Sequence, residues 1–177
     1  MKDIQTIENG ILERLNAGQT VHQIFNVIIE VLAEAVHLLI TKVFRKDDYA
    51  VKYAVEPLLK GKGPLSDLSV QLKLIYALGV ITRNEYEDCE LLLAIQAELE
   101  SDSYQYSFID DEILGPISLL HDMILPPSPP KLTRQSDKIL LTMQQHRYQQ
   151  MIRSGLVLSV TDLVIRIRQK KTFKVLS

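Results

Sequence analysis

Two glycines flank a lysine in the stretch LLKGKGPLSD, residues 58–67, and such a loop could hold a phosphate group. A P-loop needs the spacing G-x-x-x-x-G-K-[ST] after a buried strand, so that successive backbone N–H groups surround the phosphates. Here no Ser or Thr follows Lys62, Pro64 removes one N–H donor, and the preceding residues are patterned as a helix. We therefore interpret Gly61 and Gly63 as a left-handed turn between two helices.

Glu34 and His37 have the i, i+3 spacing with which helical bundles hold di-iron centres. Such a centre needs a second pair from a facing helix, and no other Glu-x-x-His occurs in the chain. Cys89 stands among acidic residues, which oppose formation of a nucleophilic thiolate. The acidic run at 110–112 is the charged start of a helix. The sequence therefore predicts no catalytic residue, no metal site and no cofactor.

The segment IRIRQKKTFK, near the C-terminus, concentrates positive charge around an aromatic ring. Its cations are Arg166, Arg168, Lys170, Lys171 and Lys174. They could contact nucleic-acid phosphates or an acidic protein partner. They could equally complement the dipole at the end of a helix and keep it soluble. No zinc-finger spacing, leucine zipper or RNA-binding aromatic signature accompanies them, and no short helix-turn-helix is evident.

The charge of the chain is unevenly distributed. Residues 84–122 contain eleven acidic residues and no Lys or Arg, whereas residues 123–177 contain ten basic and two acidic residues. The net charge of the whole chain is only −2, so the protein is not a general polyanion binder. The asymmetry can join two parts of one molecule or join two molecules.

Length and composition predict one globular domain covering residues 1–177. The single cysteine excludes an internal disulfide, and the N-terminus does not have the pattern of a signal peptide. The apolar run at 24–44 is interrupted by charged residues such as Glu30 and Glu34, which are costly in a membrane. We expect a cytoplasmic protein without a membrane span.

Helical spacing of apolar residues runs through almost the whole chain, and no alternating strand pattern is convincing. We predict an all-α, single-domain multi-helix bundle, with helices at about 3–15, 21–44, 47–59, 65–78 and 83–100, a sixth segment from 110, and last helices across 136–171, bent near Ser154 and Gly155. The proline run at 126–130 is expected to be an extended connector.

The second predicted helix is apolar around most of its circumference. Its polar residues follow one narrow line: Gln23, Asn26, Glu30, Glu34, His37 and Thr41. We expect the other helices to wrap around it. Because one small core would not readily cover so much apolar surface, we also expect a homodimer through this helix.

The third and fourth predicted helices are amphipathic. In the third, the spacing places Tyr53, Ala54 and Leu58 inward, along with Ala50, and Pro57 predicts a kink or an early end. We predict that Ser66 or Asp67 caps the start of the fourth helix and that Gly79 ends it.

Residues 51–81 carry the motifs YAV-x-PLL, GPL-x-D and L-x-LIYALG in that order, and this block resembles the mannitol operon repressor family of bacterial regulators. The residues that carry the resemblance are Tyr53, Pro57, Leu58, Leu59, Gly63, Pro64, Leu65, Asp67, Leu72, Leu74, Ile75, Tyr76, Ala77, Leu78 and Gly79.

The resemblance implies an all-helical cytoplasmic repressor of genes for mannitol uptake and catabolism. It implies action through a protein partner, either another transcription factor or a component of the sugar phosphotransferase system, and no catalytic residues. In the shared block it implies that Gly63, Pro64 and Asp67 fix the helix junction. The residues expected to supply packing are Tyr53, Leu58, Leu72, Ile75, Tyr76 and Leu78. A repressor that contacts operator DNA through the C-terminal cations, and an enzyme or metal protein, remain as alternatives.

Overall fold

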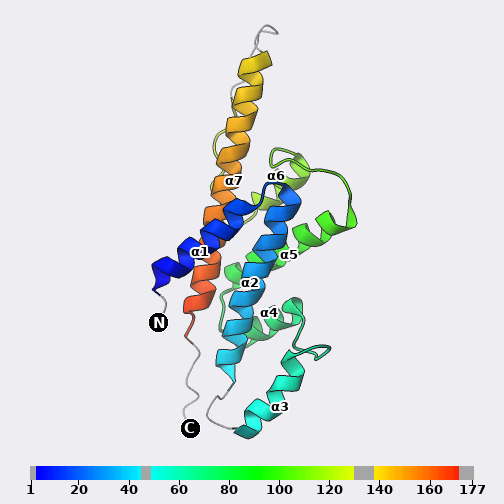
Figure 1. Cartoon of the computed structure of the whole chain (residues 1–177), viewed down its shortest axis with the longest axis vertical. Coiled ribbons are helices and arrows are strands. Elements are labelled where there is room, and N and C mark those ends of the chain that lie inside the picture. Colours follow the sequence, from blue (N-terminus) through cyan, green and yellow to red (C-terminus); the bar gives the residue numbers. More distant parts are fainter. Residues whose placement is uncertain (1–2, 45–48, 130–137, 172–177) are drawn as a thin grey trace.

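The computed structural model of the chain describes residues 3–44, 49–129 and 138–171 (Figure 1). These residues form seven helices and no strand, which confirms the predicted all-α class. The helices are α1 (Ile4–Ala17), α2 (Val21–Val43), α3 (Tyr49–Leu59), α4 (Leu68–Ala77), α5 (Arg83–Ser101), α6 (Asp111–Ile117) and α7 (Lys138–Gln169).

α2 is the central helix of the bundle, as its apolar circumference predicts. Ten of its residues are buried, and it contacts α1, α4, α5 and α7. By length and composition alone α2 could cross a membrane, but half of its most apolar window is buried inside the protein. Neighbouring helices of the same chain cover most of the apolar surface of α2, although Leu38 remains 44% exposed, and a homodimer through this helix stays a prediction.

Side-chain caps set where several helices begin. At α2 the Thr20 hydroxyl accepts a hydrogen bond from the Gln23 N–H, and the Gln23 side chain accepts one from the Thr20 N–H. Asp67 caps α4 by accepting from the Ser69 N–H at 2.7 Å. Because Asp67 satisfies the free amide there, α4 begins at Leu68 rather than at the predicted Leu65.

The turn between α3 and α4 uses its two glycines differently. Gly61 has the left-handed conformation, with φ of 62°, as predicted. Gly63 does not, which corrects the prediction for this residue. A Cβ atom at Gly63 would instead lie 2.4 Å from the carbonyl oxygens of Pro57 and Leu58. Gly63 is therefore required by close backbone packing and not by a left-handed φ.

α3 lies at the edge of the molecule and contributes no buried residue among those described (Figure 1). Tyr53 is 74% exposed and Leu58 38%, so the prediction that they face inward is wrong. Ala54 is also exposed, and the helix runs through Pro57 to Leu59 without an early end. The pattern is amphipathic, but among the described residues only Val55 and Leu59 of α3 are partly buried, beside the cleft that α3 forms with α2.

α4 contributes two of the packing residues expected of the shared block. Leu72 and Ile75 are fully buried. Tyr76 is 38% exposed, but its ring stacks on Tyr86 of α5 with ring centroids 4.5 Å apart. Leu78 is 49% exposed, so its predicted packing role is wrong. It ends the helix, and Gly79 follows with φ of 70°, the conformation expected of a terminating glycine.

α7 is one continuous helix of 32 residues that passes through Ser154 and Gly155 without interruption. From Ile152 onward it packs in the core, whereas its first half projects beyond the other helices (Figure 1). Residues 123–129 of the proline-rich segment are not helical, and Pro130 lies outside the described residues.

Candidate interaction surfaces

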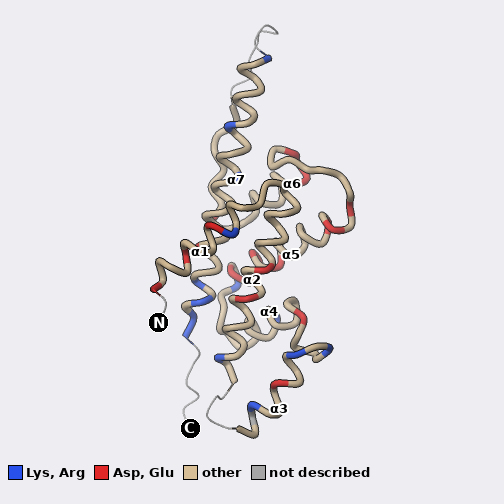
Figure 2. The backbone as a smooth tube through the Cα atoms, viewed as in Figure 1, with Lys and Arg blue, Asp and Glu red and all other residues tan. Residues whose placement is uncertain are grey.

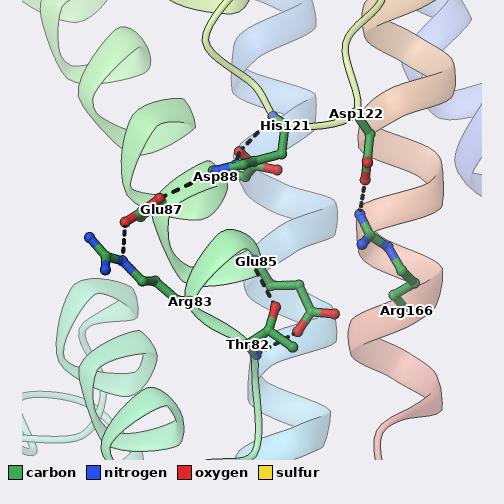
Figure 3. A network of polar contacts seen from close by, with 8 residues as sticks. All are labelled: Thr82, Arg83, Glu85, Glu87, Asp88, His121, Asp122 and Arg166. Atoms are coloured by element: carbon green, nitrogen blue, oxygen red, sulfur yellow. Dashed lines mark hydrogen bonds and ion pairs between the residues drawn. The ribbon is translucent and has the colours of Figure 1, made fainter.

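The basic end of α7 faces acidic residues of the same chain. Arg166 donates to Asp122 (Figure 3), and its Nε lies 3.1 Å from the Asp162 carboxylate. Lys170 Nζ lies 2.9 Å from Glu85 Oε1, and Arg168 lies 3.9 Å from Glu34. We call this set of contacts the charged seam. It joins basic residues near the C-terminus to Glu85 and Asp122 of the acidic central part and to Glu34 of α2.

Glu85 belongs both to the charged seam and to the start of α5. It is only 3% exposed, and its carboxylate accepts from the Thr82 N–H at 2.9 Å while the Thr82 hydroxyl accepts from the Glu85 N–H (Figure 3). Burial acts to raise the pKa of Glu85, but the Lys170 ammonium and the Thr82 N–H outweigh it and hold the pKa below its ordinary value. One carboxylate thus caps α5 and anchors the end of α7.

Three of the five predicted contact residues therefore have partners within the chain. Arg166, Arg168 and Lys170 lie in the charged seam, whereas Lys171 is exposed. Lys174 lies outside the described residues. A cation already held 2.9 Å from a buried carboxylate contributes less to phosphate binding, because that contact must first be broken.

A second polar cluster joins α5 to the residues that follow α6 (Figure 3). Asp88, only 4% exposed, accepts from the His121 N–H at 3.1 Å and lies 2.7 Å from His121 Nδ1. His121 Nε2 is 3.4 Å from Glu87, which in turn binds Arg83. The hydrogen bond to Asp88 raises the pKa of His121, and burial only partly opposes it. Sequence reasoning missed this pair, because nothing in the local pattern links positions 33 apart.

The residues considered for metal and thiol chemistry serve other roles. Arg14 binds both carboxylate oxygens of Glu34, at 2.8 and 2.9 Å, and holds its pKa below the ordinary value. His37 instead lines a cleft of about 370 Å³ between α2 and α3. Within the described ranges, no group of three His, Cys, Asp or Glu side chains is placed to hold a metal ion. Cys89 is fully buried, and burial raises the pKa of its thiol.

The outer surface keeps part of the charge asymmetry after the charged seam has formed. Acidic residues remain on α5, on α6 and on the loop between them, whereas the projecting half of α7 carries only basic charge (Figure 2). A groove of about 640 Å³ runs between α5 and α6, with Glu98, Asp102 and Glu112 among its lining residues. Such surfaces fit recognition of proteins better than binding of a polyanion.

Comparisons with known proteins agree with the resemblance in residues 51–81. The family model described as mannitol repressor matches residues 7–168. The chain is 57% identical over 174 residues to the mannitol operon repressor of Escherichia coli strain K12, covering 98% of this chain and 89% of that protein. It is also 35% identical to Fumarase E of the same strain over 82 residues, about half of each chain.

The fold is also similar to a solved structure. The X-ray structure of the MtlR-HPr complex from Escherichia coli contains a chain with a TM-score of 0.88 and 58% identity to this one. The similarity covers 92% of this chain and 99% of that chain. Over nearly its full length, the chain is therefore similar in fold and sequence to a protein crystallised in complex with HPr.

Proposed function

The chain belongs to the mannitol repressor family, and we propose that it represses transcription of the genes for mannitol uptake and catabolism by binding a protein partner. The proposed partner is HPr, a component of the sugar phosphotransferase system. The observation that carries this proposal is the complex of HPr with a protein 58% identical to this chain. A repressor that binds such a component links gene expression to the state of sugar uptake.

The internal pairing of the basic residues supports a protein partner over direct operator contact. Arg166, Arg168 and Lys170 are bound to carboxylates of the same chain, and the acidic surface of α5 and α6 would repel a DNA duplex. We therefore assign Lys171 and Lys174 no more than weak, sequence-independent phosphate contacts. We also propose that the protein acts in the cytoplasm, where HPr and the promoter are both found.

We propose further that the protein is not an enzyme. The similarity to Fumarase E covers about half of each chain, and the Asp88–His121 pair is engaged by Glu87 on its outer side. Purified protein assayed with fumarate should show no turnover above a blank. Turnover that is lost in His121→Gln would contradict the proposal and give the pair a catalytic role.

Two experiments test the proposed mechanism. Isothermal titration calorimetry with purified HPr should give a saturable 1:1 complex. A mobility-shift assay with the mannitol promoter should show only weak binding that competitor DNA removes. A tight, competitor-resistant complex with promoter DNA alone would contradict the partner mechanism. In cells, deleting the gene should raise expression of a mannitol-promoter reporter, and restoring it should lower that expression.

A further inference from the structure

The first half of α7 is mostly exposed in the part of the chain that the structure describes. We call residues 138–150 the α7 arm, which projects past the rest of the bundle (Figure 1). Its apolar side chains are exposed, including Ile139 at 78% and Met143 at 62%. A helix that leaves such side chains in water is typical of a segment that another surface covers.

The charge of the α7 arm is of one sign. Lys138 and Arg147 lie on it, and no acidic residue occurs anywhere from 138 to 161. Neither cation forms an ion pair with any residue that the structure describes. The α7 arm is therefore both apolar and basic, and its complement must be apolar and acidic.

The groove between α5 and α6 has that complementary character. Apolar side chains such as Ile95 and Ile113 line it, together with the carboxylates of Glu98, Asp102 and Glu112. Asp102 accepts hydrogen bonds from the Tyr104 N–H and the Tyr106 hydroxyl. Over the described parts of the chain, none of the three carboxylates is ion-paired, and residues 84–122 contain no Lys or Arg that could neutralise them.

The two surfaces also match in length and position. The groove follows α5 from Leu91 to Asp102, about 18 Å of helix, and the α7 arm is about 20 Å long. Gln149, at the base of the α7 arm, donates to Ser107 in the loop that follows α5. The α7 arm and the groove are therefore at the same end of the molecule.

The α7 arm cannot reach the groove of its own chain. α7 is one uninterrupted helix whose later residues are fixed in the core, so folding the arm back would break backbone hydrogen bonds of the helix. A second copy presents an identical arm without that constraint. Two copies related by a twofold axis would fill both grooves and leave no further arm or groove open.

We propose that the protein forms a homodimer in which the α7 arm of each copy lies in the α5–α6 groove of the other. Apolar contacts supply the attraction, and the pairing of Lys138 and Arg147 with Glu98, Asp102 and Glu112 sets the orientation. This inference does not rest on the proposed function, since it names a surface for self-association only.

Sedimentation equilibrium tests the charge pairing. Wild type should be dimeric at micromolar concentration, and the variant Lys138→Glu plus Arg147→Glu should dissociate at least about tenfold more readily, because each contact becomes repulsive. Glu98→Lys plus Glu112→Lys should weaken the dimer similarly, whereas mixing the two variants should restore a heterodimer. Lys73→Glu, an exposed reversal on α4, is the matched control and should change nothing. A monomeric wild type, or reversals that leave the dimer intact, would overturn the proposal.

A disulfide test locates the contact directly. Cys89 is buried, so cysteines introduced at Met143 in the α7 arm and Ala94 in the groove are the reactive ones. The double variant should form a covalent dimer on mild oxidation, and each single variant should form far less. If groove reversals abolish HPr binding without changing the oligomeric state, the groove belongs to that partner and the dimer proposal is wrong. If HPr binding survives while the dimer is lost, the partner mechanism and the dimer are independent.

Discussion

The contact between Glu85 and Lys170 decides whether the basic end of α7 is held by its own chain. A double-mutant cycle of Glu85→Gln and Lys170→Met measures it. Glutamine at position 85 can still accept from the Thr82 N–H, so the first substitution removes charge but keeps the cap of α5. Methionine keeps the length of the Lys170 side chain and removes its ammonium group.

The structure gives the expected size of the coupling. The two charged atoms are 2.9 Å apart, Glu85 is 3% exposed and the Lys170 side chain is 25% exposed. Fully exposed pairs contribute about 0.2–1 kcal/mol, and contacting residues in one network couple by about 0.5–3 kcal/mol. For this partly buried pair we expect a coupling free energy of about 1–2 kcal/mol. Lys170→Met alone should cost more than Glu85→Gln, because it leaves a buried carboxylate without its counterion.

Urea unfolding followed by circular dichroism at 222 nm supplies the four free energies of the cycle. The depressed pKa of Glu85 adds a second readout. The contribution of the Glu85 carboxylate to the free energy of unfolding is complete above the ordinary carboxyl pKa and is lost as the pH falls through its lower folded-state pKa. Wild type should therefore be more stable than Glu85→Gln at neutral pH but not in acid. A coupling below about 0.3 kcal/mol, within the usual error of additivity, would refute the reasoning and leave Lys170 free for another partner.

Three further predictions concern the α3–α4 turn, the histidine pair and DNA. Gly63→Ala should lower the free energy of unfolding by about 1–3 kcal/mol, because its Cβ would meet two backbone carbonyls, whereas Lys62→Ala should change neither stability nor nucleotide affinity in a parallel titration. Because the pKa of His121 is raised in the folded state, its contribution to the free energy of unfolding is complete below about pH 6.5 and is lost as the pH rises through the folded-state pKa. The difference in stability between wild type and His121→Gln, measured by urea unfolding, should therefore be larger at about pH 6 than at about pH 8. Any DNA binding measured against salt concentration should have a shallow slope of about −1 to −2, since carboxylates of the same chain already pair with Arg166, Arg168 and Lys170. A slope of about −4 to −5 would mean that all five tail cations contact phosphate.

The helices of the core could be predicted from the sequence because their signals are local. The capping residue Thr20 specifies where α2 begins, and the apolar stripes indicate which side of α2 and of α4 is buried. The predicted start of α4 is three residues too early, although Asp67 is one of its predicted caps. The same reasoning failed for α3, where Tyr53 and Leu58 have inward spacing but are exposed. Periodicity reports that a face is apolar. It does not report whether another part of the chain covers that face.

The polar clusters could be predicted only in outline. The charge asymmetry indicated that acidic and basic segments would meet, but not that Glu85 would meet Lys170 or that Asp88 would meet His121. Each pairing depends on how α5 packs relative to α7 and to the segment after α6. Those packing angles follow from contacts among many side chains, so no short motif records them.

The charge asymmetry has two separate consequences in the folded protein. Where α7 is buried, its cations are matched by Glu85, Asp122 and Glu34 of the same chain, and that match makes the C-terminal end structural. Where α7 leaves the bundle, its cations have no such match, and the carboxylates of the α5–α6 groove are also unmatched among the described residues. A DNA-binding repressor needs its free positive charge on one face and little negative charge beside it. Here the unmatched charges of both signs lie at one end of the molecule, an arrangement suited to contacts between proteins.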